Sequence, residues 1–224
     1  MGYVYRGIPE DLVIAIIKKF NITSFIESGT NEGKTAVWAA QWFKNVFTIE
    51  LSKQIFSSNK DKLESYDNIH PFLGNSPDVI RKILSNVEPP RLIWLDAHYN
   101  GNVELTNDEE ECPLLREIEA LNGSDQNWIF IDDARYFISP PPKPHDYLKW
   151  PDISEIMDKL KEIQESKQIL IWNDIIISPP TEYHFNELRK AFANTYSVLY
   201  ANDIPNRLLK FIRKNINKYK VIKI

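Results

Sequence analysis

The chain has 224 residues, of which 43% are hydrophobic and 26% are charged, a balance typical of one globular domain with a full core. Its formal net charge of −4 argues against general affinity for nucleic acid. Its longest early apolar run, residues 12–17, is far shorter than the roughly 20 residues of a membrane span. The single cysteine, Cys112, excludes an internal disulfide and a cysteine-rich zinc site, and it fits a cytoplasmic setting. We therefore expect one domain over residues 1–224.

Apolar runs alternate with helix-like periodicity along almost the whole chain. Helices are expected at residues 9–20, 35–43, 52–63, 77–84, 109–121, 153–166 and 183–192. Ser52 is the expected N-cap of the third of these helices. Strands are expected at residues 24–26, 46–49, 69–73, 91–95 and 128–131, within 168–177, and at 197–200. This alternation predicts an α/β fold with a seven-stranded, mostly parallel, doubly wound sheet and helices on both faces.

Two segments differ in composition from the rest of the chain. Residues 138–152 are rich in proline and are expected to form a stiff surface loop. Residues 204–224 form a basic C-terminal segment, with only positive charges from Arg207 to Lys223. That segment is interpreted either as the solvated face of a last helix and strand or as a patch for an anionic partner or acidic glycan.

A polar residue or a glycine closes each of the first five expected strands. These residues are Glu27, Glu50, Gly74, Asp96 and Asp132. In an open parallel sheet, ligands bind at the carboxyl ends of the strands, near the point where strand order reverses. The sequence therefore predicts a ligand site at this edge.

The turn at residues 27–35 has glycines at Gly29 and Gly33, which suit a tight strand-to-helix turn that a ligand approaches closely. The alternative is a plain turn with no ligand. Glu50 closes the second strand about 20 residues later, where a carboxylate typically binds ribose hydroxyls; alternatively it only caps the next helix. After the third strand, Asn75 or Ser76 is expected against an adenine edge, unless Ser76 is only a helix cap.

Together these residues resemble the motifs of class I (Rossmann-like) S-adenosylmethionine-dependent methyltransferases, over roughly residues 24–133. The resemblance implies S-adenosylmethionine as cofactor. It places Gly29, Thr30 and Gly33 along the methionine part, Glu27 near its amino group and Glu50 on the ribose. It places Asn75 and Ser76 on the adenine, and Asp96 faces both the cofactor and the reacting groups.

Three carboxylates, Asp96, Asp132 and Asp133, follow the fourth and fifth strands. Such a cluster needs a positive partner, and Mg²⁺ or Mn²⁺ is the expected metal. The arrangement resembles metal-dependent sugar O-methyltransferases of the macrocin O-methyltransferase type, which implies a hydroxyl of a sugar or glycan as the methyl acceptor. Alternatively, Arg135 pairs with Asp133 and no metal is needed.

His98 is the expected general base, because imidazole titrates near neutral pH, and Asp96 is the second expected catalytic residue. A structural loop histidine is the alternative. Tyr147 and Trp150 are expected either to stack on a sugar ring or to anchor their loop.

Other functions stay open at this point. A P-loop nucleotide-binding enzyme is disfavoured, because position 28, where its first glycine belongs, is Ser28. A Rossmann dehydrogenase lacks its strict glycine pattern, because Asn31 stands where the second glycine belongs. A non-catalytic binding module on the same fold is a further alternative. The expected partner is a small-molecule or glycan acceptor, with no nucleic acid and no membrane span, and a homodimer is compatible with the sequence.

Overall fold

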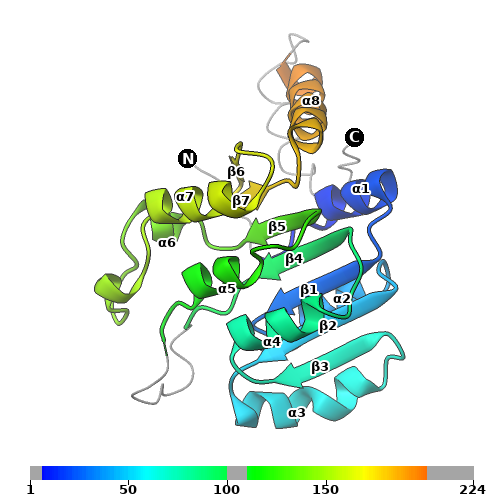
Figure 1. Ribbon diagram of the computed structural model, residues 1–224, viewed down its shortest axis with the longest axis vertical. Coiled ribbons are helices and arrows are strands. Elements are labelled where there is room, and N and C mark those ends of the chain that lie inside the picture. The colour runs from blue at the N-terminus through cyan, green and yellow to red at the C-terminus, as the bar shows by residue number, and fades with distance from the viewer. Residues whose placement is uncertain (1–6, 100–109, 201–224) are drawn as a thin grey trace, which may run out of the picture.

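The computed structural model describes residues 7–99 and 110–200, with side chains described up to residue 193. One seven-stranded sheet forms its centre, in the order β3-β2-β1-β4-β5-β7-β6 (Figure 1). The strands are β1 (Ser24–Ser28), β2 (Asn45–Glu50), β3 (Ile69–Leu73), β4 (Arg91–Leu95), β5 (Asn127–Ile131), β6 (Leu170–Trp172) and β7 (Ile175–Ser178). Strands β1 to β5 are parallel, whereas β7 runs antiparallel to both β5 and β6. The expected fold class is therefore confirmed.

The helices divide between the two faces of this sheet. They are α1 (Glu10–Phe20), α2 (Lys34–Ala39), α3 (Lys53–Glu64), α4 (Ser76–Leu84), α5 (Leu114–Ala120), α6 (Arg135–Ile138), α7 (Ile153–Ile163) and α8 (Glu182–Tyr200), with a 3-10 turn at Tyr147–Lys149. Side chains of α1, α2 and α8 pack with one set of strand residues. Those of α4, α5 and α7 pack with the other set, on the face nearer the viewer in Figure 1.

Burial alternates along the central strands because successive side chains point to opposite faces. Phe25 and Leu92 join the core under α1 and α2. Ile26 and Ile93, one residue further along, join the core under α4 and α5. All of them are fully buried, which is why β1 and β4 carry apolar residues toward both faces at these positions.

Three of the expected elements differ in the structure. The single strand expected within 168–177 is a hairpin, in which β6 and β7 are joined at Asn173 and Asp174, both with positive φ. Residues 197–200 continue α8 and form no strand. The helix expected at 109–121 begins only at Leu114, because Pro113 occupies its N-cap. The described residues thus form seven strands, but the seventh lies in the β6–β7 hairpin and not at 197–200.

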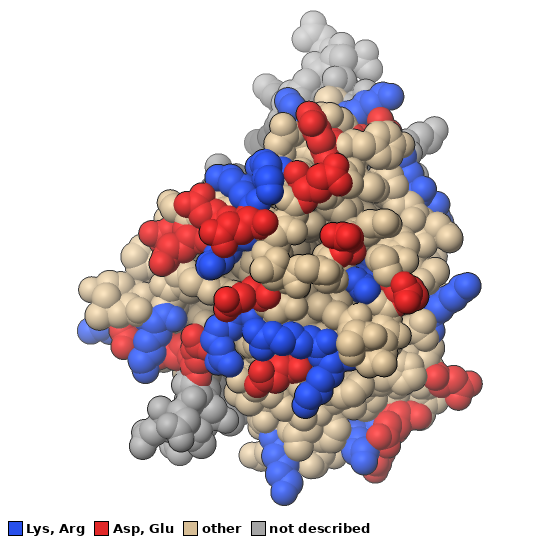
Figure 2. Space-filling view, in the orientation of Figure 1, with Lys and Arg blue, Asp and Glu red and all other residues tan. Residues whose placement is uncertain are grey.

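Of the two segments with unusual composition, only the proline-rich one lies within the described residues. Residues 138–152 contain the end of α6 and the 3-10 turn, and otherwise follow an irregular path. The basic segment at 204–224 lies outside the described residues. Within the described ranges, no helix is long and apolar enough to cross a membrane. Figure 2 shows acidic and basic side chains interspersed over the face that it displays.

Candidate functional site

The glycine turn after β1 packs tightly against the end of β4. Gly29 has φ +84°, and a Cβ atom at this position would lie 2.2 Å from the backbone oxygen of Asp96. Gly33 has φ +69°, and its Cβ would lie 2.9 Å from a methyl group of Leu63 in α3. Both glycines are thus required by contacts within the protein itself, whatever ligand lies over the turn.

A buried chain of hydroxyl groups ties this turn to β2. The Thr48 hydroxyl donates to Glu27 Oε2 at 2.6 Å, and the hydroxyls of Thr30 and Thr48 are also 2.6 Å apart. Burial raises the pKa of Glu27 to about 8, although the hydrogen bond from Thr48 opposes the shift. Glu27 and Thr30 therefore stabilise the base of the turn.

Glu50 ends β2 with its carboxylate beside the glycine turn. Its Oε2 accepts the Asn31 N–H at 3.0 Å, and its Oε1 accepts the Ser52 N–H at 2.9 Å. Each carboxylate oxygen still has a second lone pair for a ligand hydroxyl. Ser52 is the N-cap of α3, as expected, since its side chain accepts from Ile55 N–H.

Two exposed leucines flank Glu50 at the carboxyl ends of β2 and β3. Leu51 is 43% exposed and Leu73 is 45% exposed, and Leu73 is the register partner of Glu50. Next along the chain, Asn75 is the N-cap of α4 and makes no capping hydrogen bond with its side chain, which leaves the amide available. Ser76 is buried as the first residue of α4. Sequence analysis did not identify the two leucines; apolar residues at strand ends, where polar turn residues are usual, are the signal.

The expected reacting residues meet at the ends of β4 and β5. His98 Nε2 lies 2.9 Å from Asp133 Oδ2, and His98 Nδ1 lies 3.6 Å from Asp96 Oδ1. Asp133 has φ +59°, a left-handed conformation that is uncommon for a residue other than glycine. Its N–H donates to Asp132 Oδ1 at 2.8 Å. Asp96, His98, Asp132 and Asp133 therefore form one cluster, as the sequence predicts.

Arg135 supplies a positive charge to this cluster. Its guanidinium donates to Asp133 Oδ1 at 2.5 Å and to Asp174 in the β6–β7 turn. The backbone N–H of Arg135 also donates to Asp174 Oδ1, at 2.8 Å. Asp174 was not identified from the sequence, because the turn that carries it lies in the hairpin that was expected to be one strand.

Burial and neighbouring charges shift the pKa values in this cluster. Burial raises the pKa of Asp96 to about 6, with Asp133 adding to the shift, and burial together with Asp96 and Asp133 raises the pKa of Asp132 to about 8. Burial alone would lower the pKa of His98, but the hydrogen bond to Asp133 and the charge of Asp96 outweigh it and raise that pKa. Burial opposes ionisation of Asp133, yet His98 and Arg135 hold its pKa below the usual value.

The expected metal site is not supported by this arrangement. Asp133 already faces the imidazole of His98 and the guanidinium of Arg135. Among the residues that the structure describes, no three His, Cys, Asp or Glu side chains are placed to hold a metal ion. The alternative that the sequence left open, in which Arg135 pairs with Asp133, is the one observed.

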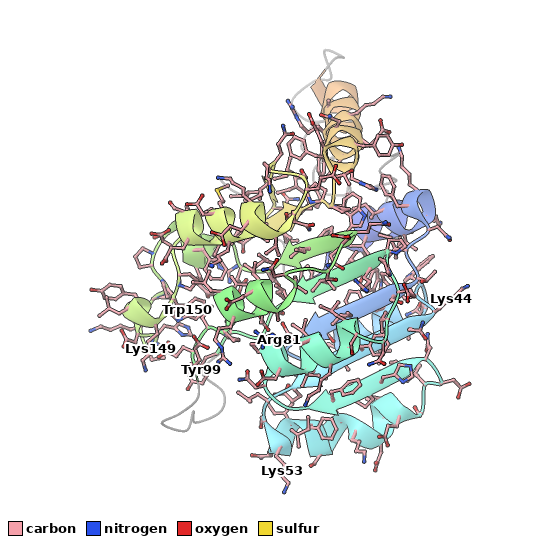
Figure 3. The ribbon with its side chains drawn as sticks, viewed as in Figure 1. Lys44, Lys53, Arg81, Tyr99, Lys149 and Trp150 are labelled. Carbon is pink, nitrogen blue, oxygen red and sulfur yellow. The ribbon has the colours of Figure 1, made fainter. Side chains whose placement is uncertain are left out.

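The proline-rich segment is fastened beside His98 by a buried carboxylate, Glu111. Its Oε2 accepts the Trp150 indole N–H at 3.0 Å and the Asp146 N–H at 3.2 Å. The Trp150 ring centroid is 5.3 Å from that of His98. Trp150 is only 7% exposed, so it anchors the loop and is not free to stack on a sugar. Tyr99, Lys149 and Trp150 lie on this side of the molecule in Figure 3.

A small cavity opens between the ends of β4 and β5. Its lining includes His98, Asp132 and Glu117, together with the apolar side chains of Leu95, Leu114 and Phe137. The expected cofactor residues Glu50 and Asn75 do not line it, so the cavity belongs to the side of the reacting residues. Glu117 was not identified from the sequence, because it lies inside a helix, where a charged residue is normally assigned to the solvent face.

Comparison with known structures identifies the fold. The chain is similar to a Staphylococcus aureus protein assigned as a caffeoyl-CoA O-methyltransferase. The match covers 79% of this chain and 85% of that protein, with 16% identity and a TM-score of 0.55. The SAH-bound methyltransferase PaMTH1 of Podospora anserina matches over 77% of this chain and 88% of its own, with 14% identity and a TM-score of 0.50. No protein-family model and no curated protein sequence matches the chain. At these identities the likeness establishes the fold, which is that of class I methyltransferases.

Proposed function

We propose that this protein is a S-adenosylmethionine-dependent methyltransferase that methylates a hydroxyl group. One observation carries the proposal: the carboxylate of Glu50 ends β2 beside the Gly29–Gly33 turn, next to the point where strand order reverses between β1 and β4. A carboxylate at this place in a doubly wound sheet suits a pair of ribose hydroxyls. The similar SAH-bound structure supports the same proposal.

The residues around Glu50 fit the remaining parts of such a cofactor. The exposed side chains of Leu51 and Leu73 offer apolar surface to a flat base, and the Asn75 amide offers hydrogen-bonding groups to its edge. The turn at Gly29 leads from Glu50 to Asp96, and hence to the reacting side. When bound there, the cofactor supplies an activated methyl group; the protein's own task is to align the acceptor oxygen and remove its proton.

His98 and Asp133 supply the proton acceptor. Asp133 accepts from Nε2 of His98, which leaves Nδ1 as the basic nitrogen of the neutral ring. Nδ1 faces Asp96 across 3.6 Å, so an acceptor hydroxyl that reaches this gap meets both side chains. We assign the transferred proton to His98 and the positioning of the hydroxyl to Asp96. A sugar or glycan hydroxyl is the acceptor class that we propose, and we assign no step to a metal.

Binding of S-adenosylhomocysteine, measured by calorimetry, tests the cofactor assignment. Glu50→Gln should weaken binding at least tenfold. The carboxylate accepts hydrogen bonds from two backbone N–H groups and, in this proposal, from the ribose hydroxyls, whereas the NH₂ of glutamine would have to face one of these donors. Glu64→Gln, on the exposed end of α3, is the matched control and should bind as wild type does. Equal affinity of Glu50→Gln and wild type would contradict the assignment.

Transfer of a labelled methyl group to a panel of mono- and oligosaccharides tests the role of His98. His98→Gln should lower kcat by roughly 100-fold or more, because it removes the proton acceptor. His70→Gln replaces an exposed histidine on β3 and should leave kcat unchanged. Wild-type turnover by His98→Gln would remove this residue from the mechanism.

A further inference from the structure

Glu117 is a buried carboxyl group that the mechanism above does not use. It lies on α5, is 1% exposed and lines the cavity between the ends of β4 and β5. Its Oε1 is buried and has no hydrogen-bond partner among the described residues. Burial raises the pKa of Glu117 to about 7, although hydrogen bonds from the hydroxyls of Ser76 and Ser28 to the carboxyl group oppose the shift. Leaving such an acceptor unsatisfied costs about 1 to 3 kcal/mol, so its presence calls for a partner that binds there.

The basic side chains near the cavity already have acidic partners. Arg135 is held by Asp133 and Asp174, and the two ring nitrogens of His98 face Asp133 and Asp96. The cavity is therefore lined by two carboxyl groups, Glu117 and Asp132, and neither has a described ion-pair partner. The imidazole of His98, which also lines the cavity, turns both nitrogens toward other acids.

The rest of the lining limits what can enter. Leu95, Leu114 and Phe137 make most of the wall apolar, so a charged group that enters loses its water and must be compensated by the carboxyls. The open space fits a group about the size of one water molecule. An ammonium group has this size and donates hydrogen bonds in several directions to carboxylate oxygens.

We propose that this cavity is a subsite for an ammonium group of a bound ligand, with Glu117 as the residue that contacts it. The proposal rests on the proposed function, because His98, which lines the cavity, is assigned there to the reacting side. The ammonium group comes either from the cofactor or from an amino-bearing acceptor, such as an amino sugar or an amino alcohol. Glu117 then selects ligands by charge, while Asp96 and His98 act on the hydroxyl.

Calorimetry with cofactor analogues that carry none, one or two ammonium groups tests the cofactor as the source. The cofactor probes are 5′-methylthioadenosine, which has no ammonium group, S-adenosylhomocysteine, which has one, and sinefungin, which has a second in place of the methyl-bearing sulfonium. If the ammonium belongs to the cofactor, Glu117→Gln lowers the affinity for S-adenosylhomocysteine, for sinefungin or for both about tenfold, relative to its effect on the affinity for 5′-methylthioadenosine. Glu119→Gln, exposed on the same helix, should change none of them.

Methylammonium provides the acceptor test at constant ionic strength. If the ammonium belongs to the acceptor, methylammonium binds to the wild type saturated with S-adenosylhomocysteine and not to Glu117→Gln, while methanol binds to neither. Should Glu117→Gln fail to fold, Glu117→Asp replaces it: the charge is kept but withdrawn from the cavity, and the same losses are expected.

Two results would overturn the subsite. One is that Glu117→Gln matches the wild type with every probe and methylammonium does not bind, in which case the cavity holds only water. The other is that methanol binds as well as methylammonium, so that charge is not recognised. Failure of S-adenosylhomocysteine to bind the wild type contradicts the proposed function alone, because methylammonium titrated into the free protein still tests the cavity.

Discussion

Individual carboxyl groups in this protein differ sharply in their surroundings, and the difference assigns their roles. Glu50 accepts two backbone N–H groups at the rim of the site and can still accept from a ligand. Glu27 is 2% exposed and bonded to a threonine hydroxyl beneath the turn. In the sequence the two glutamates look alike, because each follows an expected strand and stands next to a turn. Only the fold separates a ligand-facing acid from a buried structural one.

Glu27 should make stability depend on pH. Its pKa is raised to about 8 in the folded protein from 4.5, so the folded state binds more protons than the unfolded state between these values. Stability should therefore fall as pH rises through this window. Glu27→Gln keeps an acceptor for Thr48 but cannot ionise. In urea unfolding, its free energy of unfolding should change less than that of the wild type between about pH 5 and about pH 8, by on the order of a few kcal/mol. An unchanged pH dependence would contradict a neutral, buried Glu27.

The residues missed by sequence reasoning share a physical cause. Glu111, Glu117 and Asp174 lie in a loop, in a helix and in a hairpin turn, where charged residues are usually solvated. Their burial follows from tertiary contacts, such as the bond from the Trp150 indole to Glu111. Asp96, His98 and Asp132 were predicted, by contrast, because a strand end fixes their position at one edge of the sheet.

At the scale of elements, the alternation of apolar strands and amphipathic helices predicts β1 to β5 well. Of these, β1, β4 and β5 are buried at every position, and their central residues are apolar. The β6–β7 hairpin was missed because its two short strands form one nearly continuous apolar run, interrupted only at Asn173 and Asp174. Residues 197–200, at the end of α8, were expected as a strand because apolar residues over so few positions are compatible with either period.

The contact between the β1 turn and the end of β4 gives an element-scale prediction. Gly29→Ala would place a methyl group 2.2 Å from the Asp96 carbonyl oxygen, in addition to the strain of positive φ. Gly123→Ala has a similar φ of +78° but nothing within 4 Å of the added Cβ. We expect Gly29→Ala to lower the free energy of unfolding by about 2 kcal/mol or more beyond Gly123→Ala. Equal losses in urea unfolding would show that the turn does not need the close approach.

At the scale of the whole molecule, the sheet gathers residues from distant parts of the chain at one edge. Glu50 and Leu73 come together through β2 and β3, while Asp96 and Asp132 come together through β4 and β5. The cofactor side and the reacting side are joined by the Gly29 turn, which touches both β2 and the Asp96 backbone. Under the proposed function, this arrangement would place the methyl donor next to the acceptor hydroxyl.

The crystal structure of the complex with S-adenosylhomocysteine is the most direct test of this account. We predict that the ribose hydroxyls lie within hydrogen-bonding distance of the Glu50 carboxylate and that the adenine packs against Leu51 and Leu73. The sulfur atom should then point toward the gap between His98 and Asp96. Ligand bound elsewhere on the molecule, or with its ribose away from Glu50, would contradict the central claim.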